Sequence, residues 1–190
     1  MRKTSQKHDK EWMVQLSETP VGPLKLYFSD QGLTALEFAG EEVSLAPEQD
    51  SFPLHLLPII DAAKRELTAY FEGVSTDFAA LTLDPQGTPF QRRVWQELRR
   101  IPRGQTISYK ELAQRIGNPK ACRAVGQANG RNPIPLIIPC HRVIAADGGL
   151  GGFSSGLERK RWLLRHEGAM QDGKAEPKIR LYGLQLRQGL

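Results

Sequence analysis

The charge of the chain changes sign at one short, turn-forming segment, and this break constrains the fold more than any other feature. Residues 1–84 carry 7 Lys and Arg against 14 Asp and Glu, whereas residues 85–168 carry 15 against 5. The change falls at Asp84-Pro85-Gln86-Gly87, a sequence typical of a turn or linker. A length of 190 residues suits one domain or two small ones. We therefore predict one domain over residues 1–84, a second over 85–168 and a C-terminal tail over 169–190.

The N-terminal domain is predicted to be a small antiparallel sheet with one helix. Turn-forming residues separate three short apolar or alternating runs, which cover Trp12–Leu16, Leu24–Phe28 and Leu33–Phe38. A helix is predicted over 58–72, because apolar residues recur at spacings of three and four at Leu57, Ile60, Ala63, Leu67 and Phe71. We expect residues 1–10 to be a disordered tail, 40–53 a loop and 78–83 one more strand.

The second domain is predicted to be mostly helical. Thr88-Pro89-Phe90-Gln91 and Ser108-Tyr109-Lys110-Glu111 both match the capping box that begins a helix. The second of these helices should end at Gly117, and another should follow at once over about 118–129. Two short helices joined by a tight turn form a helix-turn-helix pattern. Residues 134–139 are predicted to be a buried extended segment, and 156–167 a last helix.

The basic second domain indicates an anionic partner. Nucleic-acid phosphates reward Lys and Arg through counterion release, although an anionic membrane or an acidic protein would also fit the charge. No apolar run approaches the roughly 18–20 residues of a membrane span, and no apolar stretch follows the basic N-terminus. The two cysteines, Cys122 and Cys140, make no disulfide framework and cannot fill a zinc site. We therefore expect a reducing, cytoplasmic setting, no structural metal and no membrane association.

Cys140 and His141 are the candidate reactive pair. A nucleophilic cysteine must be held as thiolate, which calls for a nearby histidine, a cation or a helix N-terminus. Adjacent side chains in an extended segment point apart, so His141 would act through a water or across a turn. Taken alone, the pair fits a buried, inert cysteine at least as well.

The wider sequence around the pair resembles the O6-alkylguanine-DNA alkyltransferases. Ile137–Ile144, with Pro139-Cys140-His141-Arg142-Val143 at its centre, is similar to the active-site motif of that family. The resemblance is dense over about 88–168, in segments that are similar to the family's helix-turn-helix, hinge, active-site loop and last core helix. These segments are Ile107–Ala113, Gly117–Gly126, Asn129–Pro133, Gly151–Leu157 and Trp162–Gly168.

The resemblance implies an α/β fold of the α+β kind, with a ribonuclease H-like N-terminal domain. It implies a repair protein that flips O6-alkylguanine, and in some members O4-alkylthymine, out of duplex DNA and moves the alkyl group to its own cysteine, without a cofactor. Cys140 would be the acceptor, with His141 as base and Glu167 as the group that orients it. Tyr109 would donate a proton to the guanine, and Asn132 would bridge the hinge.

The resemblance also implies a DNA-binding surface and a substrate pocket. Arg123, taken to lie mid-way along its helix, would fill the vacated stack, although a phosphate contact is the alternative. Small residues would let this helix enter the minor groove, or would only pack on a neighbouring helix; the predicted contacts are Ala121, Ala124, Gly126, Tyr109 and Arg131. The pocket would be formed by Pro135, Val143, Phe153, Ser154, Ser155 and Lys160. Lys160 would lie at the pocket edge or on a solvated helix face.

Two positions depart from the family pattern. Ser155 stands where the family commonly has glycine, so either a narrower pocket or a stiffer loop is expected, and Cys122 is an extra thiol beside Arg123. Two other functions fit parts of the sequence. One is a non-reactive module that binds alkylation damage and flags it, and the other is a helix-turn-helix transcription factor with a structural cysteine. We expect a monomer in solution, and cooperative binding along DNA is left open.

Overall fold

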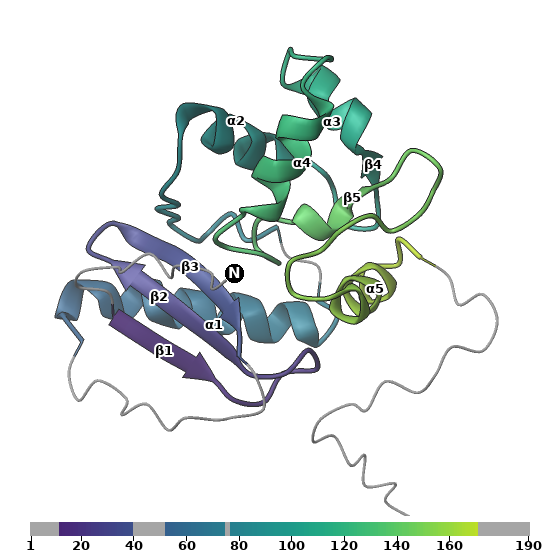
Figure 1. The fold of residues 1–190 in the computed structure, drawn as a ribbon. Coiled ribbons are helices and arrows are strands. Elements are labelled where there is room, and N and C mark those ends of the chain that lie inside the picture. Colours follow the sequence, from purple (N-terminus) through teal and green to yellow (C-terminus); the bar gives the residue numbers. More distant parts are fainter. Residues whose placement is uncertain (1–11, 40–51, 75–76, 171–190) are drawn as a thin grey trace, which may run out of the picture.

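The computed structural model describes residues 12–39, 52–74 and 77–170. A small antiparallel sheet with one helix against it forms one half, and a group of helices forms the other (Figure 1). This is the mixed fold that the sequence predicts. One hydrophobic core runs through both halves, from Val14 to Leu163. The predicted tail over 1–10, all but the first two residues of the predicted tail over 169–190, and nearly all of the predicted 40–53 loop lie outside the described residues.

The three-stranded meander is confirmed. Strands β1 (Trp12–Leu16), β2 (Leu24–Ser29) and β3 (Gly32–Phe38) pair antiparallel in the order β1-β2-β3. Alternate residues of β2, namely Leu24, Leu26 and Phe28, are fully buried, as expected of a strand that packs one face on the core. Leu26 pairs with Val14 on one side and with Leu36 on the other.

The helix against this sheet is α1 (Leu57–Phe71), preceded by the short 3₁₀ helix η1 (Leu54–Leu56). Its buried face is formed by Ile60, Ala63, Leu67 and Tyr70. The sequence predicts Ile60, Ala63 and Leu67 on that face, but it adds Leu57 and Phe71 and misses Tyr70. Leu57 is 40% exposed, and Tyr70 rather than Phe71 is fully buried. The spacing 63-67-70 satisfies the helical period as well as 63-67-71 does, so periodicity alone does not separate them.

The predicted strand over 78–83 is wrong. Only Leu83 pairs there, in an isolated parallel bridge with Leu33. Phe78 adopts a left-handed backbone with φ of 56°, and the Leu81 N–H donates to the Phe78 carbonyl, which closes a turn. The side chain of Phe78 is buried and lies 5.5 Å, ring centre to ring centre, from Tyr70. Packing of this one aromatic ring therefore replaces pairing along the segment.

The helices of the second half begin close to the predicted caps. Helix α2 (Pro89–Leu98) carries the full capping box of Thr88 and Gln91. Ahead of α3 (Tyr109–Arg115), Ser108 Oγ accepts from the Glu111 N–H, while the Glu111 carboxylate pairs with Arg115. Strand β4 (Ile107–Ser108) precedes α3 and pairs parallel with β5 (Val143–Ile144). Helix α5 is Leu157–His166.

The second helix of the helix-turn-helix begins later than predicted. Helix α4 spans Cys122–Gly130, because a turn in which the Ala121 N–H donates to the Asn118 carbonyl occupies the preceding residues. Arg123 is therefore in the first turn of α4 and not mid-way along it. Helix α2 fixes α4 from behind, since the buried Trp95 Nε1 donates to the Ala128 carbonyl at 2.9 Å.

Residues 134–139 are buried, as predicted, but they are not extended. They form a tight turn in which the Ile138 N–H donates to the Ile134 carbonyl at 2.9 Å, and Leu136 has φ of 76°. The turn packs every apolar side chain of the segment inside the core. The short 3₁₀ helix η2 (Cys140–Arg142) follows at once. No helix of the described residues is long and apolar enough to cross a membrane.

Candidate active site

Cys140 lies at a pocket of about 330 Å³ between the helix-turn-helix and the loop after β5. Several elements meet there because the turn at 134–139 returns the chain beneath α4. The residues that line the pocket are Tyr109, Gly126, Asn129, Gly130, Cys140, Gly152, Phe153 and Ser154. Its size is suited to a planar base with a small substituent rather than to a peptide or a large cofactor.

The Cys140 thiol is held in place by the backbone around it and is only 2% exposed. The backbone N–H of Cys140 donates to the Ile138 carbonyl at 2.8 Å, and the Cys140 carbonyl accepts from Asn129 Nδ2 at 3.4 Å. Burial raises the pKa of the thiol to about 11, although the Asn132 side chain and the charge of Lys160 act in the opposite direction. The thiol is therefore protonated in the free protein, and a base must take its proton when it reacts.

His141, the residue after Cys140, forms a buried pair with Glu167. His141 Nε2 lies 2.9 Å from Glu167 Oε1, and neither side chain is exposed. Burial lowers the pKa of His141 despite the opposite effect of Glu167, so the ring is neutral near pH 7. The other ring nitrogen, Nδ1, has no protein partner. A neutral histidine with one nitrogen fixed by a carboxylate and the other vacant is arranged to accept a proton.

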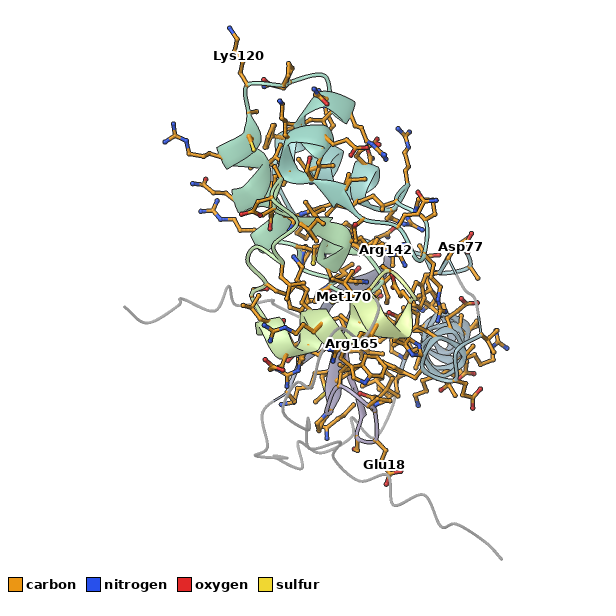
Figure 2. All side chains as sticks on the ribbon, turned by 90° about the vertical axis from the view of Figure 1, so that its right-hand side faces the viewer. Glu18, Asp77, Lys120, Arg142, Arg165 and Met170 are labelled. Atoms are coloured by element: carbon orange, nitrogen blue, oxygen red, sulfur yellow. The ribbon has the colours of Figure 1, made fainter. Side chains whose placement is uncertain are left out.

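Arg142 and Tyr70 complete the surroundings of Glu167, and sequence reasoning gives neither of them a role. Arg142 donates from Nε to Oε2 at 2.7 Å and from Nη2 to Oε1 at 2.9 Å. Tyr70 Oη donates to Oε1 at 2.8 Å. Burial would raise the pKa of Glu167, but the hydrogen bonds from His141 and Arg142 outweigh it and hold that pKa far below its usual range. Figure 2 shows Arg142 in the interior, between the two halves.

Asn132 ties together the two ends of the tight turn that leads to Cys140. Its Nδ2 donates to the Ile138 carbonyl at 2.7 Å, and its Oδ1 accepts from the Ile134 N–H at 3.0 Å. It is nine-tenths buried, so these bonds are not exchanged with water. The predicted hinge residue thus fixes the geometry of the segment that carries the thiol.

Lys160 is not on a solvated helix face. It is fully buried, and its Nζ donates to the carbonyls of Val143 at 2.6 Å and Gly152 at 3.3 Å. Burial lowers its pKa to about 8, while the nearby Cys140 acts in the opposite direction. The lysine joins the strand after the thiol to the loop that closes the pocket.

Tyr109 is the first residue of α3, and its ring is half-buried at the pocket. Burial, and next the proximity of Cys140, raise the pKa of its hydroxyl, so it is a neutral proton donor near pH 7. A β-carbon at Gly151 would lie 3.0 Å from the Tyr109 ring, and Gly151 has φ of 66°. Glycine is therefore required for the loop to approach this ring so closely.

The predicted DNA-binding residues lie along one exposed surface of α4 and its ends. Arg123, Ala124 and Arg131 are exposed, and Ala121 and Gly126 are half-buried. A β-carbon added at Gly126 would lie 3.8 Å from the Tyr109 ring, so this surface is continuous with the pocket. Cys122 is also exposed here. Figure 2 shows Lys120 at the tip of the helical half, pointing into solvent.

The structure brings some of the predicted pocket residues to the pocket and not others. Phe153 and Ser154 line it, and Phe153 packs edge-to-face on Phe38 of β3 at 6.4 Å. Pro135 and Val143 are buried and, like Ser155, are not among the residues that line it; the Ser155 carbonyl accepts from Arg159 Nη1. Asn129 is a lining residue that the sequence did not indicate, since an asparagine near a helix end carries no distinctive signal. Among the described residues, no three His, Cys, Asp or Glu side chains are grouped so that they could hold a metal ion.

Two family models match consecutive parts of the chain. The ribonuclease-like domain of 6-O-methylguanine DNA methyltransferase matches residues 13–85, and the DNA-binding domain of the same family matches residues 89–169. Together they cover most of the chain and meet close to Asp84–Gly87.

Curated relatives and solved structures agree with these matches. A methylated-DNA–protein-cysteine methyltransferase of Methanosarcina acetivorans is 45% identical over 157 residues, which is 80% of this chain and 96% of that protein. One from Mycobacterium leprae is 46% identical over 155 residues, or 79% and 88%. The crystal structure of Mycobacterium tuberculosis OGT in complex with DNA aligns with a TM-score of 0.68 and 43% identity, over 82% of this chain and 91% of that one.

Proposed function

The chain belongs to the 6-O-methylguanine DNA methyltransferase family, and from this premise we propose that it moves the alkyl group of O6-alkylguanine in double-stranded DNA to its own Cys140. It is a DNA repair protein that acts by alkyl transfer, and DNA is its partner. The observation that carries the assignment of the acceptor is the position of Cys140 at the pocket, directly before His141 in the chain, whose ring forms a buried pair with Glu167.

The transfer is a direct displacement in which the sulfur of Cys140 attacks the alkyl carbon. A carbon–sulfur bond forms while the bond from that carbon to guanine O6 breaks, and the electron pair of the broken bond remains on the base. The thiol proton passes through a water to His141 Nδ1, the ring nitrogen without a protein partner. Tyr109 donates a proton to the guanine ring. The products are guanine and an S-alkyl cysteine, so each molecule reacts once, and no cofactor takes part.

The lesion must leave the base stack to reach the thiol. The thiol is buried in a pocket, and the O6 substituent is enclosed in the duplex, so the nucleotide is flipped out at a cost of roughly a few kcal/mol. Arg123 occupies the vacated space. It lies in the first turn of α4, three residues after Lys120, which Figure 2 shows at the tip of the helical half. The other proposed contacts with the minor groove and backbone are Ala121, Ala124, Gly126, Tyr109 and Arg131.

Backbone groups recognise the flipped base. The carbonyls of Cys140 and Val143 accept from the guanine amino group, and the loop at Ser154 donates to O6. The Cys140 carbonyl already accepts from Asn129 Nδ2 and from the Val143 N–H, and the Val143 carbonyl accepts from Lys160 Nζ, so the guanine amino group shares these acceptors with donors of the protein. Phe153 is the wall nearest the alkyl group. Pro135, Ser155 and Lys160 support the pocket from behind.

The two other functions make different demands on the chain. A non-reactive module that flags damage needs the pocket and the DNA surface but not a nucleophile with its base. A helix-turn-helix transcription factor needs the exposed surface of α4 and has no use for the His141–Glu167 pair.

We propose in addition that the protein acts as a monomer. The two cysteines are free, which supports a reducing, cytoplasmic setting.

The test is transfer of the methyl group itself. The purified protein is mixed with a duplex that contains O6-methylguanine, and its peptides are read by mass spectrometry. We expect one methyl group on the Cys140 peptide and restored guanine in the DNA. Cys140→Ser should take up none, whereas Cys122→Ser should behave as the wild type. Methyl on another residue would refute Cys140 as the acceptor, and tight binding of the lesion without transfer would favour the damage-flagging module.

A further inference from the structure

The side chain of Tyr70 reaches the active site from the other half of the molecule. It belongs to α1, which packs on the three-stranded sheet, whereas Glu167 follows α5. The two residues are 97 positions apart, and the Tyr70 hydroxyl donates to Glu167 Oε1 at 2.8 Å with both side chains buried. A buried tyrosine hydroxyl usually finds a hydrogen-bond partner, and a bond to an ionised carboxylate is stronger than one to a neutral group. The Tyr70 hydroxyl therefore does more than fill space in the core.

We propose that Tyr70 is a positioning residue for alkyl transfer. Its hydroxyl holds the Glu167 carboxylate in place and limits how strongly that carboxylate stabilises a proton on His141. The inference rests on the proposed function of Cys140 and His141. Tyr70 touches neither the thiol nor the pocket, so it acts through Glu167.

The argument begins with the oxygen that Tyr70 and His141 share. Oε1 of Glu167 accepts from Tyr70 Oη at 2.8 Å, from His141 Nε2 at 2.9 Å and from Arg142 Nη2 at 2.9 Å. Each donor that bonds to one carboxylate oxygen draws on the negative charge of that oxygen, which leaves less of it for the other donors. The phenol therefore fixes the oxygen in the direction of His141 and, at the same time, weakens its pull on a proton on that ring.

The Tyr70 hydroxyl is well suited to position Glu167 because it keeps its proton and its ring is fixed. Burial, and next the charge of Glu167, raise the pKa of Tyr70 far above its ordinary value, so the hydroxyl keeps its proton. Its ring is fixed by neighbours from both halves. Arg103 lies over the ring at 5.3 Å, and Phe78 and His166 pack against it at 5.5 and 5.0 Å. The His166 ring also bonds to the Tyr70 carbonyl.

Other charged groups face the same pair and must be taken into account. Arg142 of η2 contacts both oxygens of Glu167. Lys160 of α5 lies close enough to influence His141, and the Cys140 thiol influences Lys160. All of them stay in place when Tyr70 loses only its hydroxyl. Arg103 contacts the Tyr70 ring and the carbonyls of Val74 and His166, and its hydrogen bonds do not reach Glu167. It therefore offers a control for the packing around Tyr70.

The experiment compares Tyr70→Phe with the wild type in single-turnover methyl transfer from a duplex containing O6-methylguanine, across a pH range of about 5 to 8, where histidines titrate. Activity should disappear as the pH falls through the pKa of His141, because only the neutral ring is a base. Removing the phenol leaves Oε1 with fewer donors, so it binds the His141 proton more strongly and the acid limb moves to higher pH. The plateau rate should fall about tenfold, as expected for losing one hydrogen bond to a charged group.

Two further variants separate positioning from packing. Tyr27→Phe removes an exposed tyrosine hydroxyl that contacts Glu37 on the sheet, and it should match the wild type. Arg103→Gln should lower the thermal stability and leave the acid limb where it is. A Tyr70→Phe profile identical to the wild type, or one lowered equally at every pH, would overturn the inference. Failure of the wild type itself to methylate Cys140 would instead overturn the proposed function.

Discussion

Replacing Glu167 with glutamine tests how much of the fold depends on the buried carboxylate. The change keeps the shape of the side chain and removes its charge. Arg142, only 7% exposed, then keeps its bond to the Ile101 carbonyl but has no anion beside it. Breaking a buried ion pair from one side costs about 3–5 kcal/mol of unfolding free energy. At about 2–4 °C for each kcal/mol in a chain of this size, the melting temperature should fall by about 6–20 °C.

The effect should depend on pH in a defined direction. The pKa of Glu167 is held far below its usual range in the folded protein, so the carboxylate stabilises the fold at every pH above its unfolded value of about 4.3. That contribution disappears as the pH falls through the lower, folded pKa. The difference between wild type and Glu167→Gln should therefore be full near neutral pH and should shrink in strong acid.

The assay is urea unfolding of four proteins, followed by tryptophan fluorescence and far-UV circular dichroism. They are the wild type, Glu167→Gln, Arg142→Met and the double variant. Each single variant leaves one buried charge without its opposite charge, whereas the double variant removes both charges, so it should regain most of the lost stability. It should regain no methyl transfer, because His141 still lacks its carboxylate. A Glu167→Gln protein within about 1 kcal/mol of the wild type, or a double variant less stable than both singles, would refute the reasoning.

Three further outcomes are expected. Arg123→Ala should slow repair of duplex DNA by about tenfold or more and hardly change the reaction with a free O6-alkylated base, because only the duplex must be unstacked; equal losses in the two rate assays would refute the wedge role. In a Cys122→Ser background, carboxamidomethylation of Cys140 by iodoacetamide should keep accelerating up to a pH of about 11, and a plateau near neutral pH would contradict the buried, protonated thiol. Asn132→Ala should cost about 1–3 kcal/mol in urea unfolding, because it leaves the buried Ile134 N–H without its acceptor, while the Ile138 carbonyl keeps its hydrogen bond from the Cys140 N–H.

Local chemistry made parts of this structure predictable. The capping box at Thr88 begins α2 where the sequence indicates, and the alternation along Leu24–Phe28 gives the central strand of the meander. These signals depend on neighbours within a few residues. The site around Cys140 was accessible through a family motif, and the roles given to its residues stay predictions.

Features that depend on distant contacts were not predictable. The late start of α4 and the turn at 134–139 both follow from how the chain packs in the core, and no nearby residue announces either. Tyr70 and Phe71 are neighbours with nearly equal claims to the buried face, and only the arrival of Glu167 from the far end of the chain distinguishes them. Arg142 has the appearance of an ordinary basic residue until its buried carboxylate partner is seen.

The burial of Cys140 also has a consequence for the life of the molecule between lesions. A protein that reacts once has no second chance, so every thiol lost to a peroxide, a quinone or a stray metabolite is a lost repair event. Such reagents attack thiolates at the surface, and Cys140 is neither ionised nor accessible in the free protein. The burial that requires the proposed flipping of the base also protects the Cys140 thiol from oxidation before the protein reacts. The free thiol of Cys122 is exposed at the surface and reacts with such oxidants first.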